Sequence, residues 1–145
     1  MELQHGLLSL RIDPRSAEMS LCRAASPVPG IREARALLRV RPRQGAAFEI
    51  ALGAGGLEVE ELPLTDEHGA GLLVTARSRE AMRGLRLGLE LRLYDERPFL
   101  LLRLQAANEG PERLLLPGVK PIPVAVATRG RTLLSWELRS SPLGE

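Results

Sequence analysis

The region 84–108 alternates apolar and polar residues so strictly that it predicts two β-strands and the turn between them. Every second residue from 85 to 93 is leucine, and the intervening positions hold Arg86, Gly88, Glu90, Arg92 and Tyr94. Successive side chains of a strand point to opposite faces, so the leucines predict a buried row and the other residues a solvated row. After the proline-containing turn 94–98, the row resumes at Leu100, Leu102, Leu104 and Ala106. The region is therefore predicted to be a long β-hairpin with one buried face.

Short strand-like segments, separated by glycine- and proline-containing turns, fill most of the remaining chain. We predict strands at 6–12, 17–23, 31–40, 48–52, 56–62, 72–76, 113–116, 122–127 and 132–138. The first half of 31–40 has a helix-compatible composition, but 38–41 alternates and Pro42 stops it, which favours a strand. About ten short strands of this kind predict an all-β fold, namely a supersandwich-like antiparallel β-sandwich. Residues 1–145 have the length of a single domain.

The glycine-rich stretch 52–57 lies between two predicted strands. It contains no lysine of the kind found in phosphate-binding loops, and no helix is predicted after it. We therefore interpret it as a hairpin turn, and the sequence predicts no cofactor-binding residue.

The charge balance argues against a nucleic-acid surface. Twenty basic residues face 18 acidic residues, which leaves a formal net charge of +2. The arginines of the predicted strands alternate with apolar residues and have acidic residues nearby, which is typical of a solvated sheet face. A nucleic-acid surface would show a clear excess of positive charge. We therefore predict no nucleic-acid partner.

Cysteine usage and hydropathy indicate the compartment. Cys22 is the only cysteine, so the chain can form neither an intrachain disulfide nor a thiolate metal cluster. The first five residues have no basic region and no long apolar run follows them, so we expect no signal peptide. No stretch approaches the roughly 18 continuous apolar residues of a membrane span. These features predict a cytoplasmic protein without a membrane partner.

Candidate catalytic and metal-binding residues are few. Asp13, Asp66 and Asp95 each fall in a predicted turn, where aspartate is favoured because it bonds the nearby backbone, so we interpret them as solvated turn residues. His68 lies beside Asp66 and Glu67, but a single histidine without a second one nearby is weak evidence for a metal or acid–base site. His5 belongs to no recognisable arrangement. The sequence predicts no catalytic and no metal-binding residue.

The aromatic residues and one apolar run leave two interpretations open. Phe48, Tyr94, Phe99 and Trp136 are the only aromatic residues, too few and too scattered for a sugar-binding platform, and we expect Phe48 and Phe99 to pack in the core or an interface. The proline-broken apolar run 117–126 has only Lys120 to solvate it. It is either an interface patch or a closing strand buried in the core.

Several short segments resemble a known family. Residues 66–71 and 73–76, then the run Tyr-Asp-x-Arg-Pro-Phe at 94–99 and Asn-x-Gly at 108–110, resemble the amino-terminal domain of melibiase-type α-galactosidases and raffinose synthases (glycoside hydrolase family 36). The similarity covers about residues 66–116 and is faint at 135–137. In that family the domain is a β-sandwich placed before a catalytic (β/α)8 barrel. The family's catalytic aspartates belong to the barrel, which 145 residues cannot contain.

The resemblance implies an accessory domain, or a stand-alone relative of one, in carbohydrate metabolism. Its implied role is a non-catalytic sandwich that packs against a glycosidase barrel or an oligomer partner. The alternative is an independent interaction or ligand-binding module, with carbohydrate as a candidate ligand. A complete enzyme is the third interpretation, and it is disfavoured because no polar groups converge in the sequence. A barrel domain or a second copy of the chain is the expected partner.

Overall fold

The computed structural model describes residues 1–25, 31–42, 44–111 and 114–118. The predicted strands 122–127 and 132–138 and Trp136 lie outside these ranges. The apolar run 117–126 also lies outside them, apart from its first two residues.

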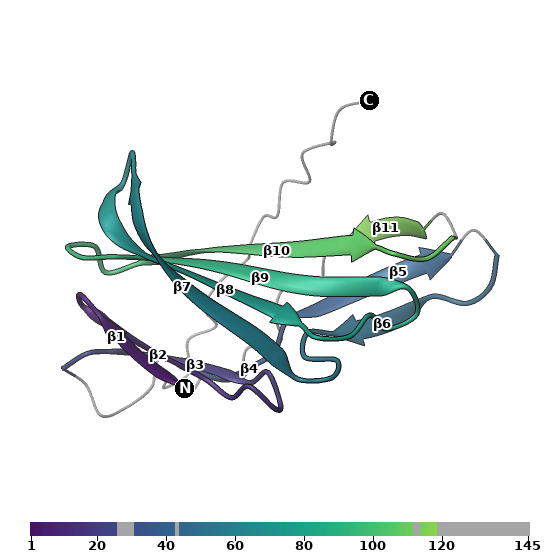
Figure 1. The fold of residues 1–145 in the computed structure, drawn as a ribbon, viewed down its shortest axis with the longest axis horizontal. Helices are drawn as coiled ribbons and strands as arrows, with labels where there is room; N and C mark the ends of the chain where they lie inside the picture. The colour runs from purple at the N-terminus through teal and green to yellow at the C-terminus, as the bar shows by residue number, and fades with distance from the viewer. Residues whose placement is uncertain (26–30, 43, 112–113, 119–145) are drawn as a thin grey trace, which may run out of the picture.

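The described residues form antiparallel β-strands and no helix. The strands are β1 (Glu2–His5), β2 (Leu8–Ile12), β3 (Met19–Arg23), β4 (Ile31–Ala34), β5 (Leu37–Pro42), β6 (Phe48–Ala51), β7 (Leu57–Asp66), β8 (Gly69–Ser78), β9 (Leu85–Tyr94), β10 (Leu100–Asn108) and β11 (Leu114–Gly118). They make three sheets, with the orders β1-β2-β3-β4, β10-β9-β8-β7 and β11-β5-β6 (Figure 1). The predicted all-β fold is confirmed, while its sandwich packing stays a prediction. No helix that could cross a membrane occurs in the part of the chain that the structure describes.

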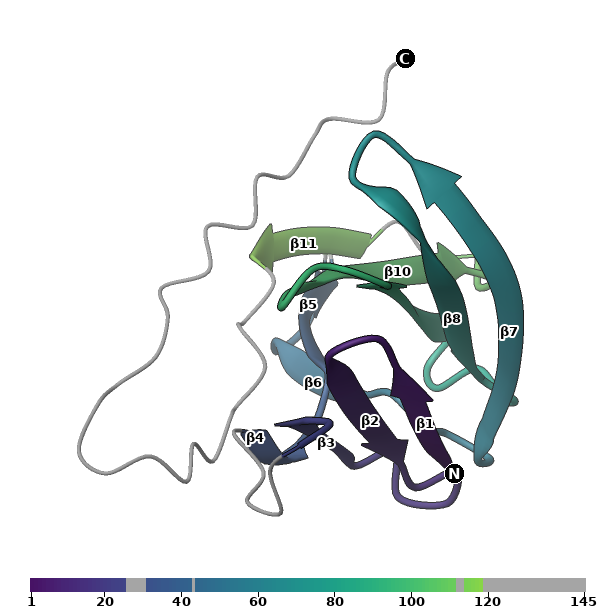
Figure 2. The ribbon, with the colours of Figure 1, turned by 90° about the vertical axis from the view of Figure 1, so that its left-hand side faces the viewer.

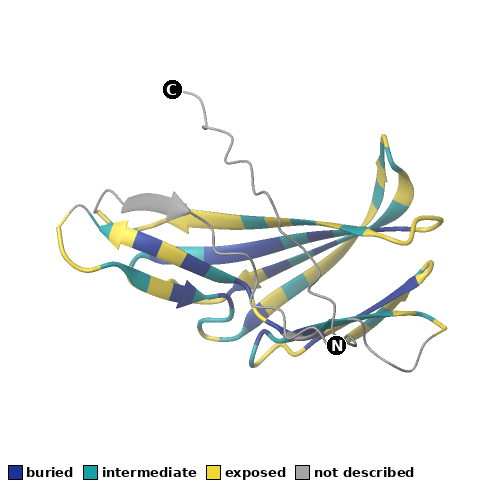
Figure 3. Cartoon of the chain, turned by 180° about the vertical axis from the view of Figure 1, so that it is seen from behind, coloured by how far each residue is buried: buried dark blue, intermediate teal, exposed yellow. Residues whose placement is uncertain are grey.

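One hydrophobic core joins the three sheets. Leu10 of β2, Val40 of β5, Val74 of β8 and Leu91 of β9 belong to the same buried cluster. Figure 2 shows the sheets arranged around this shared core, and Figure 3 shows alternating buried and exposed positions along the strands that line it. Each sheet therefore buries one face against the other two, as period-two patterning requires.

The leucine hairpin forms as predicted, with two exceptions in burial. Strands β9 and β10 pair antiparallel around the loop 95–99, and the leucines of β9 are all buried. Tyr94, which the alternation placed in the solvated row, is also buried, with 1% of its surface exposed. The predicted buried row of β10 is only half-buried, at Leu100, Leu102 and Leu104, because β10 is the last strand of its sheet.

Two predicted strands differ from the structure, one in where it starts and one in its continuity. The predicted strand 6–12 begins inside a turn at Gly6, where φ is +55°, and the turn separates β1 from β2. A side chain at Gly6 would overlap the backbone carbonyl of Asp95, so this turn packs closely on the β9–β10 loop. The predicted strand 31–40 breaks between β4 and β5, which belong to different sheets.

The glycine-rich stretch is a connection between sheets and not the hairpin turn that was predicted. It leads from β6 to β7, which do not pair with each other. Backbone hydrogen bonds join it to two other segments. Leu57 N donates to Pro14 O in the β2–β3 turn (2.8 Å), and Arg79 N, just after β8, donates to Gly56 O (3.0 Å). Gly53 N also donates to the buried Ser78 hydroxyl (2.9 Å). The stretch therefore fixes how the first and second sheets sit around the core.

Candidate functional site

Residues of two family-like segments, 66–71 and 94–99, meet at one end of the β7–β10 sheet. We call this group the Asp66 cluster, and its members are Asp66, His68, Glu90, Arg92, Tyr94 and Phe99. Antiparallel register places Gly71 opposite Tyr94 and Leu73 opposite Arg92. Successive residues of a strand point to opposite faces, so Arg92 and Tyr94 lie on the face of the sheet opposite the buried leucines of β9. Their partners Leu73 and Gly71 lie on that same face. The loop after β9 adds Phe99 beside them.

The turn between β7 and β8 positions Asp66 and His68. Asp66 pairs with Gly69 across a two-residue turn, and His68 N donates a hydrogen bond to Asp66 Oδ1 (2.9 Å). Gly69 has a φ of +123°, a conformation that glycine adopts without the strain imposed by a side chain. The aspartate thus closes its own turn, while its second oxygen faces β9 on the far side of β8.

Hydrogen bonds connect the cluster across the sheet. Tyr94 Oη donates to Asp66 Oδ2 (2.9 Å), and Arg92 Nη1 donates to the same oxygen (3.2 Å). Arg92 Nε donates to Glu90 Oε1 (2.8 Å), and Gln105 Nε2 donates to Glu90 Oε2 (3.3 Å). The network runs from β7 through β9 to β10 and ties the end of the β7–β8 hairpin to the rest of the sheet.

The structure corrects the interpretation of Asp66 as a solvated turn residue. Only 13% of its side chain is exposed, because Tyr94 and Arg92 cover it. The His68, Tyr94 and Phe99 rings also pack together, with centroids 5.6 to 6.0 Å apart in edge-on or tilted arrangements. The alternation of 84–94 does not reveal this network, because it predicts a solvated row for Glu90, Arg92 and Tyr94. The available signal in the sequence was an acidic residue at the end of one strand, together with an arginine two residues before a tyrosine on another strand.

The electrostatics of the cluster favour fixed protonation states. Burial raises the pKa of Asp66, but hydrogen bonds from the His68 amide and from Tyr94 outweigh it, so the pKa lies below its usual 3.8. Burial and the hydrogen bond to Asp66 raise the pKa of Tyr94. At neutral pH the cluster therefore holds a carboxylate, a guanidinium and a neutral phenol that satisfy one another. Such a closed network suits a structural clamp better than proton transfer.

The lowered pKa of Asp66 predicts an acid-dependent loss of stability. A carboxyl whose pKa is depressed in the folded state stabilises the fold above its unfolded pKa, and this contribution disappears as pH falls through the folded pKa. Asp66→Asn keeps one acceptor oxygen, for the His68 amide, but removes the charge and turns an NH2 donor toward Tyr94 Oη and Arg92 Nη1. We expect Asp66→Asn to melt below the wild type at neutral pH, with the difference narrowing as pH falls below 3.8. Thermal melts across the acid range measure this, and a constant difference would contradict the assignment.

The Asn-x-Gly motif closes the opposite end of the hairpin. Gly110 N donates to Asn108 Oδ1 (3.1 Å), and Glu109 N donates to Gly84 O (2.7 Å). Arg86 binds both carboxylate oxygens of Glu109, at 2.7 and 3.1 Å. This hydrogen bonding lowers the pKa of Glu109. The family-like segments 94–99 and 108–110 therefore lie at the two ends of the β9–β10 hairpin, the first between the strands and the second after β10.

Of the other candidate residues, the structure brings His5 and Asp95 together and leaves Asp13 and Cys22 apart from them. Asp13 forms an exposed turn in which Arg15 N and Ser16 Oγ donate to it, both at 2.9 Å, as predicted. His5 Nε2 contacts the half-exposed carboxylate of Asp95, which joins the first hairpin to the β9–β10 loop. Cys22 is partly buried against Ser9 O (3.7 Å). Among the described residues no three metal-binding side chains form a group that could hold an ion.

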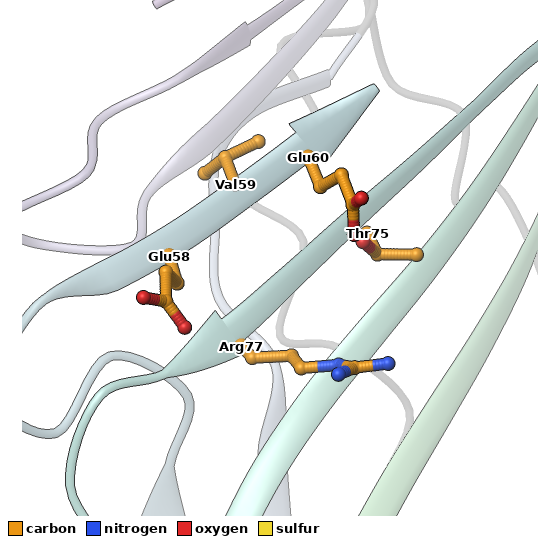
Figure 4. Close-up of a pocket in the computed structure, with 5 residues that line it drawn as sticks. All are labelled: Glu58, Val59, Glu60, Thr75 and Arg77. Carbon is orange, nitrogen blue, oxygen red and sulfur yellow. The ribbon is translucent and has the colours of Figure 1, made fainter. Parts of the chain in front are cut away.

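A small hollow lies farther along the same sheet (Figure 4). It has a volume of about 200 Å³ and is lined by Glu58, Val59, Glu60, Thr75 and Arg77. The Glu60 and Thr75 side chains lie next to each other, while Arg77 extends away from Glu58 over β9, where its Cγ lies against Gly88. The volume is below the roughly 300–1,000 Å³ of ordinary small-molecule sites.

Comparison of the chain with protein-family models, with curated protein sequences and with solved structures found no match. The resemblance of residues 66–116 to α-galactosidases therefore stays a prediction. The geometry of the β7–β10 sheet is the basis of the function proposed below.

Proposed function

We propose that this chain is a non-catalytic β-domain that docks against a partner domain through the β7–β10 sheet. As the family-like motifs imply, that partner is the barrel of an α-galactosidase-type glycosidase, or an oligomer partner, in the cytoplasm. The observation that supports this most directly is the group of apolar side chains on the solvent-facing side of this sheet. Leu62, Leu101 and Phe99 expose 43%, 38% and 39% of their surface beside the Asp66 cluster.

A role in packing against another protein explains the exposed apolar side chains beside the Asp66 cluster better than a catalytic role does. Exposed apolar side chains grouped around a satisfied polar network are typical of interfaces, in which polar groups fix orientation and apolar groups supply affinity. The Asp66 cluster holds its charges in fixed positions without an obvious nucleophile–base pair. The alternative, an independent ligand-binding module, has the small hollow beside Glu60 in its favour, although its size suits one side chain better than a sugar ring.

The first test is enzymatic. The purified chain should release no nitrophenol from nitrophenyl α-galactoside under conditions in which a complete α-galactosidase is active, because the nucleophile and acid belong to a different domain. Asp66→Asn is the matched variant, since it changes a carboxylate of the cluster that is only 13% exposed and keeps its shape. Turnover by the wild type that this variant abolishes would contradict a non-catalytic role.

The second test identifies the partner. The reading frame after the codon for Glu145 supports the proposal if it encodes a barrel with paired aspartates. A stop codon there favours the independent module. Co-purification of the two separately expressed parts would then measure docking directly, with Leu101→Arg as the variant expected to weaken it.

A further inference from the structure

The solvent-facing side of the β7–β10 sheet is complementary to itself, row by row. We call it the outer face, and it carries Leu62, Leu64, Leu73, Thr75, Glu60, Glu90, Arg92, Leu101 and Arg103. One register row contains Glu60, Thr75, Glu90 and Arg103 in order across the four strands. The next row contains Leu62, Leu73, Arg92 and Leu101. Each row thus has one member on β7 and one on β10, the two edge strands of the sheet.

The edge positions of the first row have opposite charges. Glu60 on β7 and Arg103 on β10 are both exposed, and neither forms an ion pair or a hydrogen bond with the residues that the structure describes. In contrast, the central members of the outer face, Glu90 and Arg92, pair with each other. The unpaired charges of this row are therefore acidic at one edge of the sheet and basic at the other.

The edge positions of the second row are both exposed leucines. Leu62 lies two residues after Glu60, and Leu101 lies two residues before Arg103. A two-fold axis parallel to the strands, above the outer face and midway between β8 and β9, places β7 of one copy over β10 of the other. It keeps each row in register, so Glu60 meets the second copy's Arg103 and Leu62 meets its Leu101. This alignment falls within the range of face-to-face sheet packing, in which mean strand directions stay within about 30° of each other.

We infer that a second copy of this chain docks on the outer face around such an axis. The inference rests on the proposed docking role and names a second copy as the occupant. Glu60 and Thr75 line the hollow beside β7, which has room for one long side chain, so the hollow receives the partner copy's arginine (Figure 4). Two such contacts form, one at each edge, as the symmetry of an isologous interface requires.

The size of the outer face predicts a weak dimer. Ten-residue strands rise about 3.3 Å per residue and lie about 4.8 Å apart, so four of them present roughly 600 Å² per copy. A pair would bury about 1,200 Å² in total, at the lower limit of specific interfaces. We therefore expect a dissociation constant in the micromolar range.

Sedimentation equilibrium of the full chain, with a charge-swap series, tests the inference. Glu60→Arg and Arg103→Glu each place like charges together at both edges, so each should raise the dissociation constant by at least about tenfold. The double variant restores opposite charges in exchanged positions and should return the constant to near the wild-type value. Glu61→Arg is the matched control, because Glu61 is exposed on the same strand but points to the other face, and it should have little effect.

The outcomes separate this inference from the proposed function. A strictly monomeric wild type at roughly 500 µM, well above a micromolar dissociation constant, overturns self-docking. A dimer that the swap series leaves unchanged overturns it too, because the contact then lies elsewhere. Neither result bears on the absence of turnover or on docking to a barrel. Turnover by the chain, conversely, would remove the non-catalytic role without touching the charge-swap result.

Discussion

Leu89→Ala should destabilise the fold by about 2–5 kcal/mol, which is the range for deleting a fully buried leucine and leaving a cavity. Leu89 lies at the centre of the buried row of β9, with 1% of its surface exposed. The core there joins all three sheets, and close packing leaves little room for the neighbours to relax into the cavity. Urea-induced unfolding, monitored by circular dichroism, gives the change in the free energy of unfolding.

Leu102→Ala is the matched comparison. It makes the same chemical change on the paired strand, but Leu102 is half-buried because β10 has no described neighbour on its other side. Truncation should therefore cost about 1–2 kcal/mol, in proportion to the smaller apolar area removed from contact. If Leu102→Ala proves the more damaging of the two, a further element must cover β10 in solution.

Local pattern was enough to predict the hairpin but not its surroundings. The alternation of 85–93 specifies one face because a slip by one residue would move every leucine to solvent. The same alternation does not say which strand ends the sheet, so it placed Leu102 and Leu89 in equivalent positions. Edge and centre are properties of the strand order, which depends on pairing between segments far apart in the sequence.

The Asp66 cluster shows the same limit for the site. Asp66 and Tyr94 are 28 residues apart, and their contact depends on the register of β7, β8 and β9 together. A single-strand pattern places Tyr94 on the face opposite the leucines, yet it cannot show that His68 and Phe99 cover the ring there and that Tyr94 is buried. The turn preference of aspartate was predicted correctly for Asp13 but gave an incomplete description of Asp66. Its backbone contact to His68 accounts for only one of its two oxygens.

The prediction of a hairpin turn at 52–57 was wrong for a related reason. Glycine clusters mark places where the chain turns or where another backbone comes close, and composition alone does not distinguish the two. Here both apply. A side chain at Gly53 would overlap Ala17 on the β2–β3 turn, so the glycine allows two sheets to approach each other.

Gly71→Ala should destabilise the chain by about 1–3 kcal/mol, the range for inserting a methyl group where there is no space for it. Gly71 pairs with Tyr94, and a Cβ at this position would overlap the carbonyl oxygen of Leu93. That oxygen belongs to the backbone of β9 and cannot rotate away as a side chain could. Accommodating the methyl group therefore requires β8 and β9 to separate beside the Asp66 cluster, and the Tyr94–Asp66 hydrogen bond should weaken as well.

Gly88→Ala provides a control with the opposite sign. Gly88 lies on the outer face of the same sheet, but an added Cβ would lie 3.4 Å from Cγ of the flexible Arg77 side chain. The substitution should be neutral or stabilise by up to about 1 kcal/mol, because alanine restricts the unfolded chain more than glycine does. Thermal melts of both variants, with tyrosine fluorescence reporting on Tyr94, measure the difference. Equal effects of the two substitutions would show that generic strand propensity determines the result, and that the close approach of β8 to β9 at Gly71 has little energetic weight.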